Sequence, residues 1–193
     1  EQVQPKDLDA SEIEARLGAT WISEDYITQF MAETFHTPRY YVGDRIKVQY
    51  AEVTGQWNVT GKSVDSYGNA LVTSTYGTQR ANAYRLLEDA LNLRDTKIYD
   101  TIEDADGEHR VLNKKETMLA QQKQEMIKEA FKEWIFRDID RREALCKKYN
   151  ELFNSSRPRE YDGSHIQFTG MTPEITLMPH QKNAVAHILY GNN

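Results

Sequence analysis

The spacing of apolar residues predicts two short helices at the start of the chain. Residues 9–12, Asp-Ala-Ser-Glu, have the spacing of a capping box, in which two side chains satisfy free amide groups in the first turn of a helix. Ile13 and Leu17 follow four residues apart, and Gly18 supplies a left-handed stop. A second helix is predicted between Ser23 and Pro38, because its apolar residues share one face: Ile27, Phe30, Met31 and Phe35.

After Pro38 the period changes to two, which predicts strands. Apolar residues at 46, 48 and 50 alternate with polar ones, and the turn Thr54-Gly55 leads to a partner strand over 56–59. We also predict a third strand over 70–76 and a helix over 78–91. A second hairpin is predicted around Asp106-Gly107, because Asp-Gly supplies the positive φ values of a tight turn.

From Asn113 the apolar period is helical for about forty residues. Asp140 and Glu143 have the spacing of another capping box, so the run is predicted to break near residues 136–140. Residues 155–176 carry scattered proline and glycine and are predicted to be an irregular connector. A last helix is predicted over 177–190.

These elements predict an α+β fold: a small mixed sheet of hairpins with one helix, flanked by an N-terminal helical pair and long C-terminal helices. The predicted regions are an acidic helical pair (1–37), a small α+β module (38–113), a long broken helix (114–154), and a connector leading to a further domain (155–193).

Charge does not favour nonspecific DNA binding. Residues 1–37 contain eight acidic and two basic residues, which accounts for the whole net charge of −6, and the remainder is neutral. No apolar run approaches the ~18 residues that a membrane span needs. The single cysteine, Cys146, excludes an internal disulfide and is interpreted as a tolerated thiol in a reducing cytoplasm. We therefore expect a cytoplasmic protein without a membrane partner.

Three motifs fail on spacing. Gly61-Lys62-Ser63 suggests a phosphate-binding loop, but that motif needs a glycine about five residues earlier, where Gln56 stands. Acidic residues at 104, 106 and 108 lack the loop of about twelve residues that an EF-hand requires. The five histidines include no pair with the spacing of a zinc helix. No catalytic or metal site is predicted.

Aromatic residues are the best candidates for surface chemistry. Tyrosine and tryptophan rings can stack on bases, although more of them are expected in the core. Tyr40 and Tyr41, beside Arg39 and Arg45, form the strongest candidate for nucleic-acid contact.

Five stretches resemble giant bacterial mobile-element and phage proteins that join a DNA adenine methylase to a Swi/Snf-like, superfamily-two helicase. Their strings are long and irregular and do not follow from helix or strand periodicity. They lie at residues 8–22, 113–117, 149–154, 157–165 and 171–191.

The resemblance places this chain between the methylase and the first ATPase lobe, with residues 155–193 as the connector and the start of that lobe. It implies that Gln181 reads the adenine of ATP, since an amide offers one donor and one acceptor; a plain helix-surface glutamine is the alternative. Met178 stands where related helicases often have arginine or another polar group. Arg157, Arg159 and Lys182 become further candidates for nucleic-acid contact.

The resemblance also implies that the parent protein uses S-adenosylmethionine, together with ATP and magnesium, whereas no cofactor is expected for this segment alone. Two hypotheses follow. The segment is either a non-catalytic connector that engages DNA beside the methylase and helicase domains of the same polypeptide, or a purely architectural, protein-docking module. An independent enzyme is a weaker third hypothesis.

Overall fold

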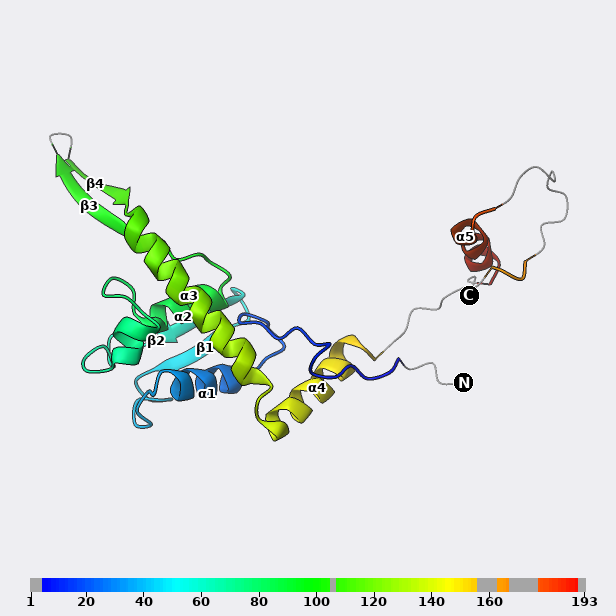
Figure 1. Cartoon of the computed structure of the whole chain (residues 1–193), viewed down its shortest axis with the longest axis horizontal. Coiled ribbons are helices and arrows are strands. Elements are labelled where there is room, and N and C mark those ends of the chain that lie inside the picture. Colours follow the sequence, from blue (N-terminus) through cyan, green and yellow to red (C-terminus); the bar gives the residue numbers. More distant parts are fainter. Residues whose placement is uncertain (1–4, 105–106, 156–162, 167–176, 191–193) are drawn as a thin grey trace. The chain divides into compact units, whose positions relative to one another are not determined.

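The computed structural model describes residues 5–104, 107–155, 163–166 and 177–190 (Figure 1). The chain divides into two compact units, one formed by residues 7–152 and the other by residues 1–6 with 153–193.

The larger unit contains helices and two hairpins, so the predicted α+β class is confirmed. Each hairpin forms its own two-stranded antiparallel sheet, whereas a single mixed sheet was predicted. The elements in chain order are α1 (Glu24–Thr34), β1 (Lys47–Ala51), β2 (Gln56–Thr60), the π-helical turn η1 (Leu71–Thr75), α2 (Ala83–Leu91), β3 (Tyr99–Asp104), β4 (Gly107–Leu112), α3 (Lys114–Ile135) and α4 (Ile139–Phe153).

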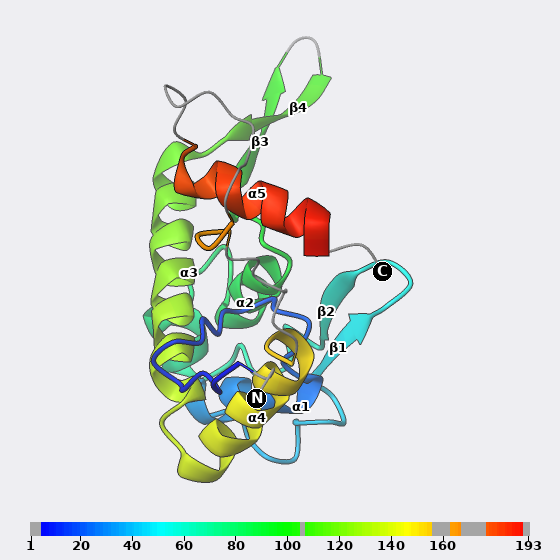
Figure 2. The ribbon, with the colours of Figure 1, turned by 90° about the vertical axis from the view of Figure 1, so that its right-hand side faces the viewer.

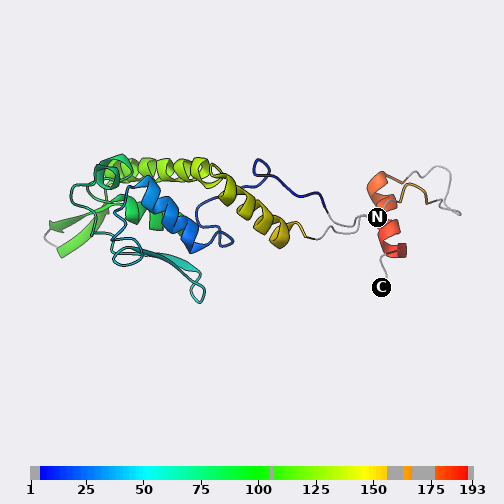
Figure 3. The ribbon, with the colours of Figure 1, turned by 90° about the horizontal axis from the view of Figure 1, so that it is seen from below.

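One hydrophobic core holds this unit together. Helices α1 and α2 contact α3 on one side and the β1–β2 hairpin on the other, and Figure 3 shows α1 between them. Phe30 of α1 packs edge-on against Phe131 and Trp134 of α3, with ring centroids 5.1 and 5.5 Å away. Because these contacts cross the predicted boundaries at residues 37 and 113, the first three predicted regions share one core.

The predicted helix over residues 9–18 is wrong. The Asp9 amide donates to the Glu12 carboxylate at 3.0 Å, and the Asp9 carboxylate accepts from the Ser11 amide at 2.8 Å, but these bonds close only one turn. Ile13, Ala15 and Leu17 are buried, while the residues between them are exposed. This alternation is the period of extended chain. The segment packs alternate side chains into the core, so the N-terminal pair contains one helix.

The predicted strand over residues 70–76 is also wrong. The Asn69 carbonyl accepts from the amides of Val72 and Thr73, and its side-chain oxygen accepts from the Leu71 amide at 3.1 Å. Asparagine thus starts a helical turn, and these local bonds outweigh the strand preference of the β-branched residues that follow. Helix α2 begins at Ala83, capped by the Asn82 side chain, whereas the prediction began it at residue 78.

The long helical run breaks between Ile135 and Ile139, as predicted. The capping residue is Asp138, whose carboxylate accepts from the Arg141 amide at 2.9 Å, whereas Asp140 was predicted. Buried Arg141 closes the end of α3 by donating to the carbonyls of Trp134 (2.7 Å) and Ile135 (2.9 Å). Its guanidinium also lies 3.5 Å from the Trp134 ring centroid.

The β3–β4 hairpin extends beyond the N-terminal end of α3 (Figures 1 and 2). Its base is attached by Arg80, which donates to Asp100 and to the Tyr99 carbonyl, each at 2.8 Å. The side chains of β4 are all exposed.

In the smaller unit, the last predicted helix is α5 (Pro179–Tyr190). Gly163 packs against it so closely that a Cβ at this position would collide with the Lys182 carbonyl.

Arg141→Ala should lower the free energy of unfolding by about 2–4 kcal/mol, because it leaves two carbonyls at the end of α3 without their donor and uncovers Trp134. Arg141→Lys should recover less than half of the loss, because lysine lacks the planar fork. Urea unfolding measures both effects.

The matched control is Arg142→Ala, an exposed arginine on the same helix, which should change stability by less than about 0.5 kcal/mol. Equal stability of the Arg141→Ala and Arg142→Ala variants would show that Arg141 does not close α3.

Candidate nucleic-acid interface

The loop between α1 and β1 contains four of the predicted contact residues. It is a series of tight turns, in which the Pro38 carbonyl accepts from the Tyr41 amide at 2.9 Å. The Tyr41 carbonyl then accepts from both Arg45 (3.0 Å) and Ile46 (2.8 Å). Tyr41 consequently rests on the core, while the Tyr40 side chain is 72% exposed.

The side chains of this loop contact one another. The rings of Tyr40 and Tyr41 lie edge to face, with centroids 4.4 Å apart, and the Arg45 guanidinium lies 5.8 Å from the Tyr41 centroid. A phenol with the ordinary tyrosine pKa of about 10 is neutral at physiological pH, and Tyr41 raises the pKa of Tyr40 further. A neutral ring does not repel a phosphate, and most of the Tyr40 surface is exposed.

A second loop, residues 61–69, is fastened to the first at both ends. Gly61 has a φ of +68°, and a Cβ there would collide with the Arg45 carbonyl. At the other end, the Asn69 amide donates to the Phe35 carbonyl at 2.9 Å and to the Asp65 carboxylate at 2.7 Å.

A buried hydrogen-bond network supports the junction between the two loops. The Tyr84 hydroxyl donates to the Asp65 carboxylate at 2.9 Å and lies 2.7 Å from the Thr37 hydroxyl. Burial raises the pKa of Tyr84, so the hydroxyl keeps its proton. The two loops therefore share one hydrogen-bonded support.

Tyr67 lies in the second loop, between the two attachment points, and its side chain is 98% exposed. Its sequence context, Ser66-Tyr67-Gly68-Asn69, is typical of a turn. We define the tyrosine–arginine patch as five residues from the two loops: Arg39, Tyr40, Tyr41, Arg45 and Tyr67.

The only charged residues of the patch are its two arginines. Arg39 and Arg45 are exposed, and Asp44, which lies between them in sequence, is exposed too. In the second loop, Lys62 pairs with Glu88 at 2.8 Å, and Asp65 is buried. Aromatic surface, more than cationic charge, distinguishes this part of the molecule.

The other predicted contact residues are not in this unit. Arg157 and Arg159 lie outside the described residues. Gln181 and half-buried Lys182 lie in the first turn of α5, where the Gln181 side-chain oxygen accepts from the Met178 amide at 2.9 Å. Gln181 thus caps the start of its own helix, as in a capping box.

Trp57 and Trp134, whose rings could also stack on bases, are buried in the core.

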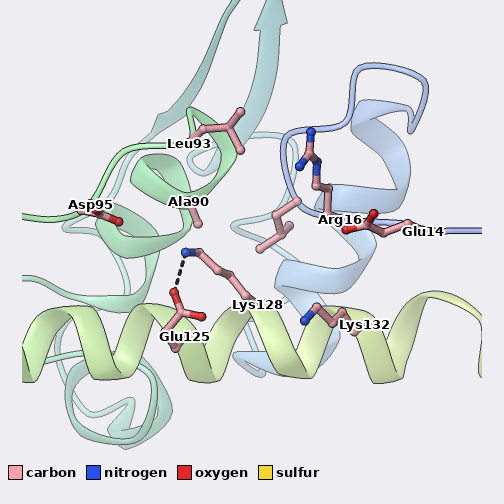
Figure 4. Close-up of a pocket in the computed structure, with 9 residues that line it drawn as sticks. Glu14, Arg16, Ala90, Leu93, Asp95, Glu125, Lys128 and Lys132 are labelled. Carbon is pink, nitrogen blue, oxygen red and sulfur yellow. Dashed lines mark hydrogen bonds and ion pairs between the residues drawn. The ribbon is translucent and has the colours of Figure 1, made fainter.

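A hollow of about 290 Å³ lies between residues 14–17, the end of α2 and α3 (Figure 4). Its charged lining is balanced, with Glu14, Asp95 and Glu125 against Arg16, Lys128 and Lys132. Lys128 is already paired with Glu125 at 2.6 Å. This balance does not favour an anionic ligand such as a phosphate.

Within the described residues, no group of three or more His, Cys, Asp and Glu side chains is placed to hold a metal ion. None of the helices in that part of the chain combines the length and apolar composition needed to cross a membrane.

Residues 16–155 match a family described as a domain of unknown function, DUF8437. No curated protein and no solved structure matches the chain. The match covers both loops of the tyrosine–arginine patch and ends before α5.

Gly61→Ala should destabilise the protein by more than about 1 kcal/mol, because the new methyl group meets both a positive φ and the Arg45 carbonyl. Gly43→Ala is the matched control: its φ is +79°, but nothing lies within 4 Å of the added Cβ. Gly43→Ala should therefore lose only the free energy that a positive φ costs an alanine.

Thermal or urea unfolding compares the two variants. Equal losses would contradict the close packing of the second loop on Arg45.

Proposed function

The chain belongs to the DUF8437 family, and we propose that it is a non-catalytic connector that engages DNA within a larger methylase–helicase protein. The observation that supports DNA engagement is the tyrosine–arginine patch, in which two joined loops present aromatic rings and two arginines. Tyrosine rings stack on bases and arginine binds phosphate, so this combination suits nucleic acid.

The attachment of both loops to the core adds to this support. Side chains that are already positioned lose less conformational freedom on binding. Here the loops are fixed by Gly61, Asn69 and the buried Tyr84 network. Tyr40 and Tyr67 therefore stay exposed on a supported surface.

The surface of α5 supports a place within a larger protein. Ala186 is its only buried residue, whereas Ile188, Leu189 and Tyr190 are exposed. An apolar helix surface of this kind favours docking on another domain. We propose that this domain is the first ATPase lobe, where Gln181 would turn from capping α5 to reading the adenine of ATP.

In this proposal, the parent protein uses ATP with magnesium for translocation and S-adenosylmethionine for adenine methylation, in a bacterial cytoplasm. The chain itself contributes neither active site. Its partners are DNA and the methylase and helicase domains of the same polypeptide.

A purely architectural role is the second candidate, and the β3–β4 hairpin favours it. Ile102 and Val111 are exposed on one face of the hairpin, whose nearby charges are mainly acidic. Apolar side chains on a projecting hairpin suit docking on protein more than contact with phosphates.

If the chain engages DNA through this patch, its affinity for DNA should depend only weakly on salt concentration. About two phosphate contacts give a slope of log K against log salt of roughly −1.4 on single strands and −1.8 on duplex. Arg39→Gln with Arg45→Gln should weaken binding by roughly tenfold at low salt and bring the slope towards zero. Fluorescence anisotropy of the full chain with labelled DNA measures both quantities.

The charge-matched control is Arg142→Gln with Lys147→Gln, two exposed bases on α4. It should leave affinity within about twofold, because these residues lie outside the patch. Undetectable binding of the unaltered chain to any DNA would favour the architectural role.

We also predict that this chain does not bind ATP at micromolar concentrations, because its sequence contains no glycine-rich loop with the spacing that cradles phosphates. Titration calorimetry with magnesium and ATP should give no binding heat. A micromolar dissociation constant would contradict this prediction and would point to a nucleotide site within these residues.

A further inference from the structure

Two rings of the patch are largely exposed. Tyr40 and Tyr67 are 72% and 98% exposed, although each stands on a loop that is fixed from below. Exposed tyrosines on fixed loops form a stacking surface, and every base has a π-face that can lie on it.

The cations of the patch are too few for tight duplex binding. Arg39 and Arg45 are its only basic residues, and Asp44 lies between them in sequence. Duplex affinity depends strongly on the number of phosphates neutralised. Stacking adds affinity without further positive charge, so this surface favours unpaired bases.

The patch also lacks an element of the shape that reads duplex. The major groove admits a helix or a two-stranded ribbon, whereas the patch consists of two turn-rich loops. The β3–β4 hairpin is a ribbon, but Asp100, Glu103 and Glu108 make its charge unfavourable for a groove. Its Arg110 already stacks on Tyr99, at 4.8 Å from the ring centroid.

From these observations we infer that the tyrosine–arginine patch binds single-stranded nucleic acid in preference to duplex, with bases stacked on Tyr40 and Tyr67 and phosphates on Arg39 and Arg45. This inference rests on the proposed function and narrows its ligand to an unpaired strand. Tyr41 supports Tyr40 by its edge-to-face contact and is itself covered by Arg45.

The test is anisotropy of the full chain with a labelled single strand of about ten nucleotides, within the site sizes of known single-strand binders, and with the matching duplex. We expect the single strand to bind at least about tenfold more tightly. Tyr40→Leu and Tyr67→Leu should each weaken single-strand binding by about tenfold, because they remove the aromatic face. Tyr40→Phe should keep most of the affinity, because it retains that face.

Tyr99→Leu is the matched control, since Tyr99 is also a partly exposed tyrosine beside an arginine but lies on the hairpin. It should leave binding unchanged. Circular dichroism of each variant shows whether it is folded.

The possible outcomes separate the two proposals. Tighter binding of the single strand that depends on Tyr40 and Tyr67 supports the inference. Equal or tighter binding of duplex overturns the inference and leaves DNA engagement standing. Failure to bind either probe overturns both. Single-strand binding that is unaffected by Tyr40→Leu and Tyr67→Leu overturns the assignment to this patch.

Discussion

The buried hydroxyl of Tyr84 is the interaction on which the candidate interface depends. It connects Thr37, in the loop after α1, to Asp65 in the second loop. The Asp65 carboxylate in turn accepts a hydrogen bond from Asn69. A buried polar group is costly unless it is hydrogen-bonded, so this network is favourable only when the loops are joined. The surface above it is therefore coupled to the core. A loop pair built in this way can present exposed aromatic rings without losing its shape.

Much of this architecture follows from the sequence where one period is sustained. The run from Lys114 to Phe153 has a helical period long enough to predict both helices and the break between them. The two hairpins were predicted equally well, because their turn residues match the required backbone conformations. The chain from Ile13 to Leu17 was ambiguous, since apolar residues at 13, 15 and 17 fit a strand while those at 13 and 17 also fit a helix. Packing of alternate side chains into the core favours the extended conformation. This tertiary contact cannot be inferred from the local sequence.

The candidate site was only partly predictable for a related reason. Arg39, Tyr40, Tyr41 and Arg45 are close in sequence, so their proximity needs no knowledge of the fold. Tyr67 enters the patch only because Gly61 and Asn69 attach a distant loop to the first. The sequence signal is Gly61, which also fits part of a phosphate-binding motif. A glycine is needed at this position because the backbone packs closely on the Arg45 carbonyl.

The proposal that this DUF8437 chain is a DNA-engaging connector combines an aromatic patch on two attached loops with an apolar surface on α5. The most direct measurement is a nuclear magnetic resonance titration of the full chain with a short single-stranded DNA. The account predicts that shifted backbone amides concentrate in residues 36–46 and 61–69, with little change in the hairpin or in α5. Shifts centred on residues 97–112 or 179–190 instead, with both loops unaffected, would contradict it.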